Sequence, residues 1–162
     1  MAVSSRSLPT VSSTACTSSC YARADARPNA LSRWLASQPG AIVFQWPAAD
    51  PAALPGPDPS YLFESTKHWR VLINGYAAFY PAAYLALLDA VRDFPSADAL
   101  DAVSRHGATH VVVHPWRMTP AQFEDVKRDV ASRGLPFDGC FDGPFGRACV
   151  YRLMGRAQGG TP

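Results

Sequence analysis

Residues 61–81 read YLFESTKHWRVLINGYAAFYP and combine aromatic rings, a histidine, an asparagine and hydroxyl groups. The mixture follows neither the 3.6-residue period of an amphipathic helix nor the alternation of a half-buried strand. Stacking rings, together with hydroxyl and amide groups that hydrogen-bond, are typical of a polar ligand pocket. The stretch therefore predicts a binding site, most naturally one for a saccharide, but it does not define a reaction.

Glu64 and His68 are the pair in this stretch that could do acid–base chemistry. If residues 61–68 are helical, the two side chains lie on one helix face at i and i+4. They are then either a surface carboxylate–imidazole pair or a catalytic pair, in which Glu64 fixes the tautomer of His68 as general base. Ser65 and Thr66 lie beside them without a GxSxG elbow, and the chain has no Walker loop and no GxGxxG. Serine hydrolysis and nucleotide binding through those motifs are therefore not expected.

The aromatic residues of the stretch leave two interpretations open. Trp69, Tyr76, Phe79 and Tyr80 either fill the hydrophobic core, as large rings commonly do, or form a platform for a ligand. Asn74 and Gly75 predict a turn next to a phenol, although asparagine also serves turns without any ligand.

The four histidines of the chain do not predict a metal site. His110 and His114 lie on one face of a predicted strand, but four residues of strand separate them by about 13 Å. A single zinc ion cannot span that distance, since a Zn–N bond is only about 2.0–2.1 Å long. His106 falls at a helix end, where a cationic side chain complements the helix dipole. We expect no metal and no cofactor.

Cys140 and Cys149 face each other in a predicted hairpin centred between Pro144 and Phe145. Directly opposed residues have Cβ atoms about 4.5–5.5 Å apart, which a disulfide can bridge at a non-hydrogen-bonded pair. We expect the bridge in an oxidising compartment and two buried thiols in the cytosol.

The remaining elements follow from caps, periodicity and prolines. Helices are predicted from Asn29 to Pro39–Gly40, over 61–68, from Pro81 to Val91, from Ser96 to Gly107 and over 119–134. Strands are predicted over 41–46 and 109–114 and in a hairpin of 137–141 with 148–153. The proline-rich residues 48–60 predict an exposed loop, and residues 109–141 a parallel strand–helix–strand crossover. The predicted fold class is α/β, with one small mixed sheet of about four strands and helices packed on it.

Length and composition limit the domain organisation. The 162 residues are 48% hydrophobic and carry a formal net charge of +2. This suits one α/β domain at 29–154, preceded by a Ser/Thr-rich disordered segment at 1–28 and followed by a frayed tail at 155–162. The scattered charges give no footprint for nucleic acid. Without a signal peptide or membrane span, the chain as written is expected to be cytoplasmic.

Three pieces of the sequence carry a resemblance: SRWLASQPGAIVFQWP, YLFESTKHWRVLINGY with the following FYPAAY, and HGATHVVVH. Over residues 29–153 the chain resembles the extracytoplasmic C-terminal domain of polytopic bacterial membrane proteins, which are related to membrane-embedded glycosyltransferases using lipid-linked sugars. The middle piece is the most specific. The sequence departs from the family pattern at Val71, where a proline is expected, and at Ala77 and Ala78, where a Ser-Gly pair is expected.

The resemblance implies that the chain is a fragment or detached domain of a protein whose transmembrane region, holding the catalytic carboxylate, lies outside it. Its partners are then that transmembrane region and a saccharide or polyprenyl-linked sugar. The implied ligand-binding positions are Ser65, Thr66, His68, Trp69, Asn74, Gly75 and Tyr76.

Three functions are therefore considered. The first is a non-catalytic accessory or substrate-covering domain of a membrane glycosyltransferase-like protein, on the extracytoplasmic face of the membrane. The second is a free-standing soluble enzyme with His68 as general base and Glu64 as its orienting residue. The third is a purely structural domain. A close Glu64–His68 contact in a deep pocket favours the enzyme, whereas full burial of His68 and Asn74 with internal hydrogen bonds favours the structural domain.

Overall fold

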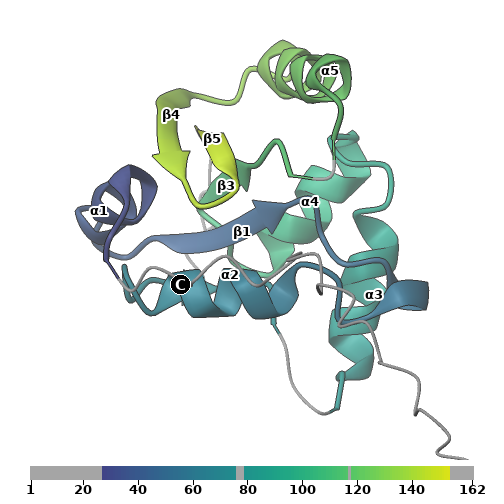
Figure 1. Cartoon of the computed structure of the whole chain (residues 1–162). Coiled ribbons are helices and arrows are strands. Elements are labelled where there is room, and N and C mark those ends of the chain that lie inside the picture. Colours follow the sequence, from purple (N-terminus) through teal and green to yellow (C-terminus); the bar gives the residue numbers. More distant parts are fainter. Residues whose placement is uncertain (1–26, 76–78, 117, 154–162) are drawn as a thin grey trace, which may run out of the picture.

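The computed structural model describes residues 27–75, 79–116 and 118–153, which form a mixed α/β fold (Figure 1). The predicted segments 1–28 and 155–162 lie outside these residues, apart from residues 27 and 28. In chain order the elements are α1 (Ala30–Ala36), β1 (Ile42–Trp46), the 3₁₀ helix η1 (Pro51–Ala53), α2 (Asp58–Ser65), β2 (Val71–Leu72), α3 (Ala82–Ala90), α4 (Ala97–Arg105), β3 (His110–Val113), α5 (Pro120–Ser132), β4 (Phe137–Gly143) and β5 (Gly146–Arg152).

The described strands form one sheet of five strands in the order β2-β1-β3-β5-β4. Strand β1, next to the edge strand β2, pairs in parallel with β2 on one side and β3 on the other. β5 runs antiparallel to both β3 and β4, so β4 runs parallel to β3 with β5 between them. The α/β class with a mixed sheet is confirmed. The expected number of about four strands was too low, because β2 is only two residues long.

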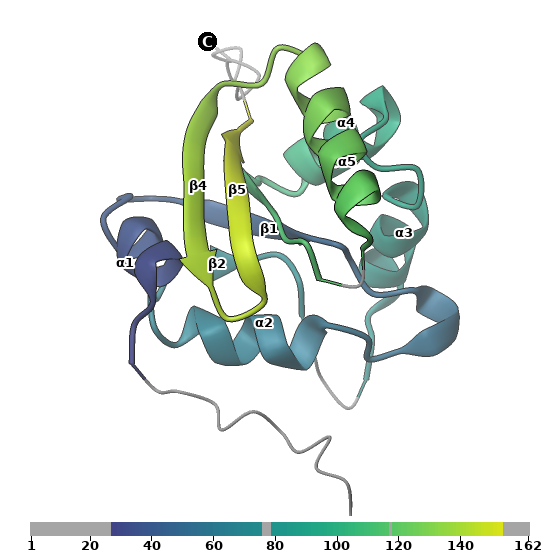
Figure 2. The same ribbon diagram turned by 45° about the horizontal axis from the view of Figure 1, so that its top comes forward.

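The alternation of side chains along the strands divides the core between the two faces of the sheet. On one face, α1 packs Leu31 and Leu35 against Val43 and Val112. On the other face, Phe44, Val111 and Val113 contact buried residues of α3, α4 and α5. Helix α2 crosses the end of the sheet at which β4 turns into β5 (Figure 2).

The helix starts follow the predicted caps. The Asn29 side chain accepts the backbone N–H of Ser32 at 2.9 Å, and Ser96 accepts that of Ala99 at 3.2 Å. Thr119 forms a reciprocal capping box with Gln122 at the start of α5. Each cap satisfies a backbone donor that the first helical turn leaves without an intrahelical partner.

The predicted exposed loop at 48–60 is wrong in part. The segment contains η1 and the first turn of α2, and Ala49 and Asp58 are buried. Proline ends a helix when it lies in the interior, but it is compatible with the first turn, where its missing N–H has no partner to lose. Helix α2 thus begins three residues earlier than the predicted helix at 61–68 and ends at Ser65, three residues earlier than expected.

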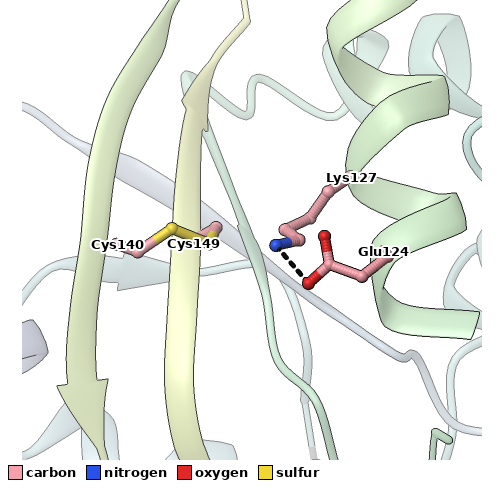
Figure 3. Close-up of a disulfide and its surroundings, with 4 residues drawn as sticks. All are labelled: Glu124, Lys127, Cys140 and Cys149. Atoms are coloured by element: carbon pink, nitrogen blue, oxygen red, sulfur yellow. Dashed lines mark ion pairs between the residues drawn. A yellow bond between two sulfur atoms is a disulfide. The ribbon is translucent and has the colours of Figure 1, made fainter. Parts of the chain in front are cut away.

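The C-terminal hairpin has the predicted centre. Gly143 pairs with Gly146 across the turn, and Cys140 lies directly opposite Cys149. Their Cα atoms are 4.0 Å apart and the sulfur atoms are joined in a disulfide. Figure 3 shows this bridge between β4 and β5, with the Glu124–Lys127 ion pair of α5 (2.7 Å) beside it.

Candidate functional site

The connections of the sheet reverse direction beside β1. The chain leaves β1 for β2 on one side and then returns to β3 on the other side of β1. In α/β proteins, the carboxyl ends of parallel strands at such a switch point are the usual place for ligands. Here the buried polar residues Gln45, Asn74 and His114 lie at or just beyond those ends.

Asn74 extends the short strand β2 with its side chain. Its Oδ1 accepts the backbone N–H of Gln45 at 2.6 Å, and its Nδ2 donates to the Gln45 carbonyl at 3.0 Å. The side-chain amide thus replaces the next backbone amide of the ladder. Asn74 is only 2% exposed, so this amide is not available to a ligand from solvent.

Gln45 also connects β1 to β3. Its side-chain Oε1 lies 2.7 Å from Nε2 of His114. The imidazole of His114 is stacked on the ring of Tyr61 in α2, with centroids 5.2 Å apart and planes 21° apart. Burial lowers the pKa of His114 to about 3, so this imidazole is neutral at pH 7.

His68 lies in the turn after α2 and is buried. Its Nδ1 accepts the backbone N–H of Arg70 at 3.0 Å. Burial, and secondarily the charge of Arg70, lower the pKa of His68 to about 4. The Arg70 guanidinium itself donates to the carbonyls of Leu35 and Ala36 and so ties this turn to the end of α1.

Glu64 lies in α2, before the turn that holds His68, and its carboxylate bonds elsewhere. Its Oε2 accepts the amide N–H of Asn29 at 2.9 Å, and its Oε1 is paired with Lys67 at 2.6 Å. Neither ring nitrogen of His68 is recorded in a hydrogen bond with this carboxylate among the described residues. Glu64 therefore connects α2 to α1 and does not orient the imidazole.

A second set of polar residues, Asp58, Gly75 and Tyr84, connects α2 with α3. The carboxylate of Asp58 accepts the Tyr84 hydroxyl at 2.5 Å, and that hydroxyl oxygen accepts the N–H of Gly75 at 3.2 Å. Burial raises the pKa of Asp58 to about 6, although the bond from Tyr84 opposes the shift. Burial and the neighbouring carboxylate raise the pKa of Tyr84. These contacts hold the turn at Gly75 against the start of α2.

The predicted ligand residues fall into two groups. The hydroxyls of Ser65 and Thr66 donate to the carbonyls of Leu62 and Phe63, and His68 and Asn74 are buried. Trp69 differs from all of them, because it is 83% exposed and has a backbone φ of 55°.

Exposure excludes the core interpretation for two of the aromatic residues of the stretch. Trp69 and Phe79 (76% exposed) are not core residues. Tyr80 is half-buried and stacks on Tyr84, with ring centroids 6.2 Å apart. Tyr76 lies outside the described residues.

His106, His110 and His114 do not come together. His106 caps α4 with Nδ1 2.9 Å from the Ala102 carbonyl, and His110 contacts Thr109 and Trp34. In the described part of the chain, no group of three or more His, Cys, Asp or Glu side chains is arranged to hold a metal ion.

Sequence reasoning missed Gln45, Asp58, Tyr61 and Tyr84 as members of the polar interior, and it considered His114 only as a metal ligand. Two of them carried a usable signal. Gln45 interrupts an otherwise apolar strand, and His114 follows another, and polar residues at the carboxyl ends of buried parallel strands meet at one sheet edge. Asp58 and Tyr84 carried no such signal, because they lie in different helices.

Compared with known protein families, curated proteins and solved structures, the chain matches none. Within residues 27–75, 79–116 and 118–153, no helix has the length and apolar character needed to cross a lipid bilayer.

Proposed function

We propose that this chain is a non-catalytic binding domain for a saccharide or lipid-linked sugar, and that it serves as the accessory or substrate-covering domain of a glycosyltransferase-like membrane protein. Trp69 is the observation that carries the proposal. It is 83% exposed and occupies a left-handed conformation at the end of the turn that follows α2. Glycine is the usual residue at such a position, and bulky residues there are uncommon.

The cost of this conformation is not offset by burial of the indole. Strained backbone in proteins is concentrated at functional sites, where the geometry itself is needed. An exposed indole that stands out from a helix end offers a flat apolar face, and the apolar face of a sugar ring stacks on such a surface.

His68 and Asn74 are buried with internal hydrogen bonds, which is the arrangement expected of structural residues, so the proposal assigns them no ligand contact and rests on Trp69. Together with Arg70 they hold the segment that presents Trp69. The enzyme alternative needs an accessible His68 oriented by Glu64, and the hydrogen bonds of Glu64 to Asn29 and Lys67 do not favour it.

The cysteine pair supports an extracytoplasmic location. Disulfides persist in oxidising compartments and are rare in the cytosol. The Cys140–Cys149 bridge joins neighbouring strands at a directly opposed pair, so both half-cystines fit the hairpin as it stands.

Binding can be tested by NMR on the ¹⁵N-labelled full chain, titrated with methyl glycosides of common pyranoses and furanoses and then with a polyprenyl-phosphate glycoside in nanodiscs. We expect one ligand class to shift the indole N–H signal of Trp69. The Trp69→Ala variant should bind that ligand at least about tenfold more weakly, a loss of about 1.4 kcal/mol.

The matched control is Phe137→Ala. Phe137 is also an exposed ring (59%), but it lies on β4, at the opposite edge of the sheet from β2. We expect this variant to retain binding within about twofold. The proposal is overturned if no glycoside shifts the Trp69 signal, or if both variants bind as the unaltered chain does.

A further inference from the structure

A small, partly open cavity lies between α1, α2 and the carboxyl ends of β1 and β3. Its polar lining comes from Asn29, Ser32, Gln45, Glu64, His68 and His114. It has about 10 Å³ of room for the centre of a water-sized sphere. This is close to the minimum that a cavity needs to hold one water molecule, provided that polar partners line it.

His68 presents a hydrogen-bond donor here. Its Nδ1 accepts the backbone N–H of Arg70, so in the neutral ring the proton is on Nε2. The residue is 3% exposed, and Nε2 is buried without a hydrogen-bond partner among the described residues. A buried N–H left in this state carries a desolvation cost.

His114 presents the complementary acceptor. Its Nε2 lies 2.7 Å from Oε1 of Gln45, and an amide oxygen can only accept, so Nε2 carries the proton. Nδ1 is then a lone-pair acceptor. His114 is 1% exposed, and within the described part of the chain its Nδ1 has no partner either.

The charges around the cavity favour a neutral occupant. Both carboxylate oxygens of Glu64 are engaged, one by Asn29 and one by Lys67. The Arg70 guanidinium is directed to the carbonyls at the end of α1. Burial lowers the pKa of both histidines, so both rings are neutral at pH 7.

We propose that this cavity is a binding site for one water molecule, which accepts the Nε2–H of His68 and donates to Nδ1 of His114. The water satisfies one buried donor and one buried acceptor, and it connects the turn after α2 with the end of β3. Occupancy of this site does not require sugar binding at Trp69, because the two groups that bind the water are buried.

Two NMR measurements on the ¹⁵N-labelled full chain test the site. Long-range ¹H–¹⁵N correlations report the tautomers, and we expect the proton on Nε2 in both His68 and His114. A through-space cross-peak should connect the Nε2–H of His68 to a water that exchanges more slowly than bulk water. Exposed His106 is the internal control and should show no such slow water.

Two substitutions of His68 separate the donor from the bulk of the ring. His68→Gln keeps an N–H near the position of Nε2, so the bound water and the His114 tautomer should persist. His68→Leu removes the donor, and the slow water at His114 should be lost. The inference is overturned by a proton on Nδ1 of either histidine or by the absence of the cross-peak in the unaltered chain, and neither result depends on the folding of a variant.

Discussion

Asn74 uses its side-chain amide where a longer strand would use backbone. Because the amide has one acceptor and two donors in the spacing of a peptide group, it can bond both the N–H and the C=O of Gln45. The chain can therefore end β2 at Leu72 without leaving the backbone groups of Gln45 in β1 unpaired. This explains why an asparagine in an apparent turn is among the most deeply buried polar residues of the described fold.

The replacement Asn74→Ala leaves the N–H and the carbonyl of Gln45 buried without these partners. We expect the free energy of unfolding to fall by about 2–6 kcal/mol, since two buried groups lose their partner and each costs about 1–3 kcal/mol. Urea unfolding followed by circular dichroism measures the change. The control is Ser65→Ala, which loses only a bond to the Leu62 carbonyl and should change stability by less than about 0.5 kcal/mol. Similar effects of the two variants would contradict the structural role of Asn74.

At the scale of elements, the turn after α2 exposes the Trp69 side chain at a cost in stability. The backbone N–H of Trp69 still bonds the Ser65 carbonyl at 2.8 Å, so the residue closes the helix in a left-handed conformation. A β-carbon in that conformation approaches its own backbone closely, which glycine avoids.

The substitution Trp69→Gly should therefore raise the free energy of unfolding by about 1 kcal/mol while it removes sugar binding. The comparison is Trp69→Ala, which keeps the β-carbon and should bring no gain in stability. Urea unfolding of the two variants, run beside the glycoside titration, gives both quantities. A stability of Trp69→Gly at or below that of Trp69→Ala would show that no strain is stored at this position.

The elements differed in how far the sequence determined them. All five predicted helices are present in the described residues. Three of them begin at the predicted caps Asn29, Ser96 and Thr119, whose effect is local. β2 could not be predicted, because Val71 is exposed and the two-residue strand has no periodicity. The start of α2 was missed because proline blocks a helix interior but not its first turn.

The candidate site was harder to predict than the elements. The stretch 61–81 differs in composition from an ordinary core, but exposure depends on tertiary packing that no local pattern encodes. His68 and Asn74 face inward and Trp69 outward, although all three belong to the same polar and aromatic run. The Glu64–His68 pair failed for a related reason: α2 ends before His68, so the helical spacing no longer applies.

At the scale of the molecule, the disulfide stabilises the sheet edge formed by β4. It closes a loop between residues 140 and 149, and a loop of that length is worth about 2–3 kcal/mol through the entropy of the unfolded chain. We expect a phosphine reductant to lower the free energy of unfolding by that amount in urea titrations. The double variant Cys140→Ser/Cys149→Ser should have a lower free energy of unfolding than the unaltered chain, and the reductant should not change it. If the reductant does not change the free energy of unfolding of the unaltered chain, the bridge does not form in solution.

The same bridge also decides how the domain responds to mechanical force. When the chain is stretched from its ends, tension follows the shortest covalent route, which here crosses from Cys140 to Cys149 and bypasses residues 141–148. Residues 141–148 then do not extend, which shortens the stretched chain by about 25–30 Å, given about 3.3–3.6 Å per residue. The turn of the hairpin, which lies against α2 through the Tyr61–Phe145 ring contact, carries no direct load. Reduction would release that length and make the hairpin turn part of the stretched path.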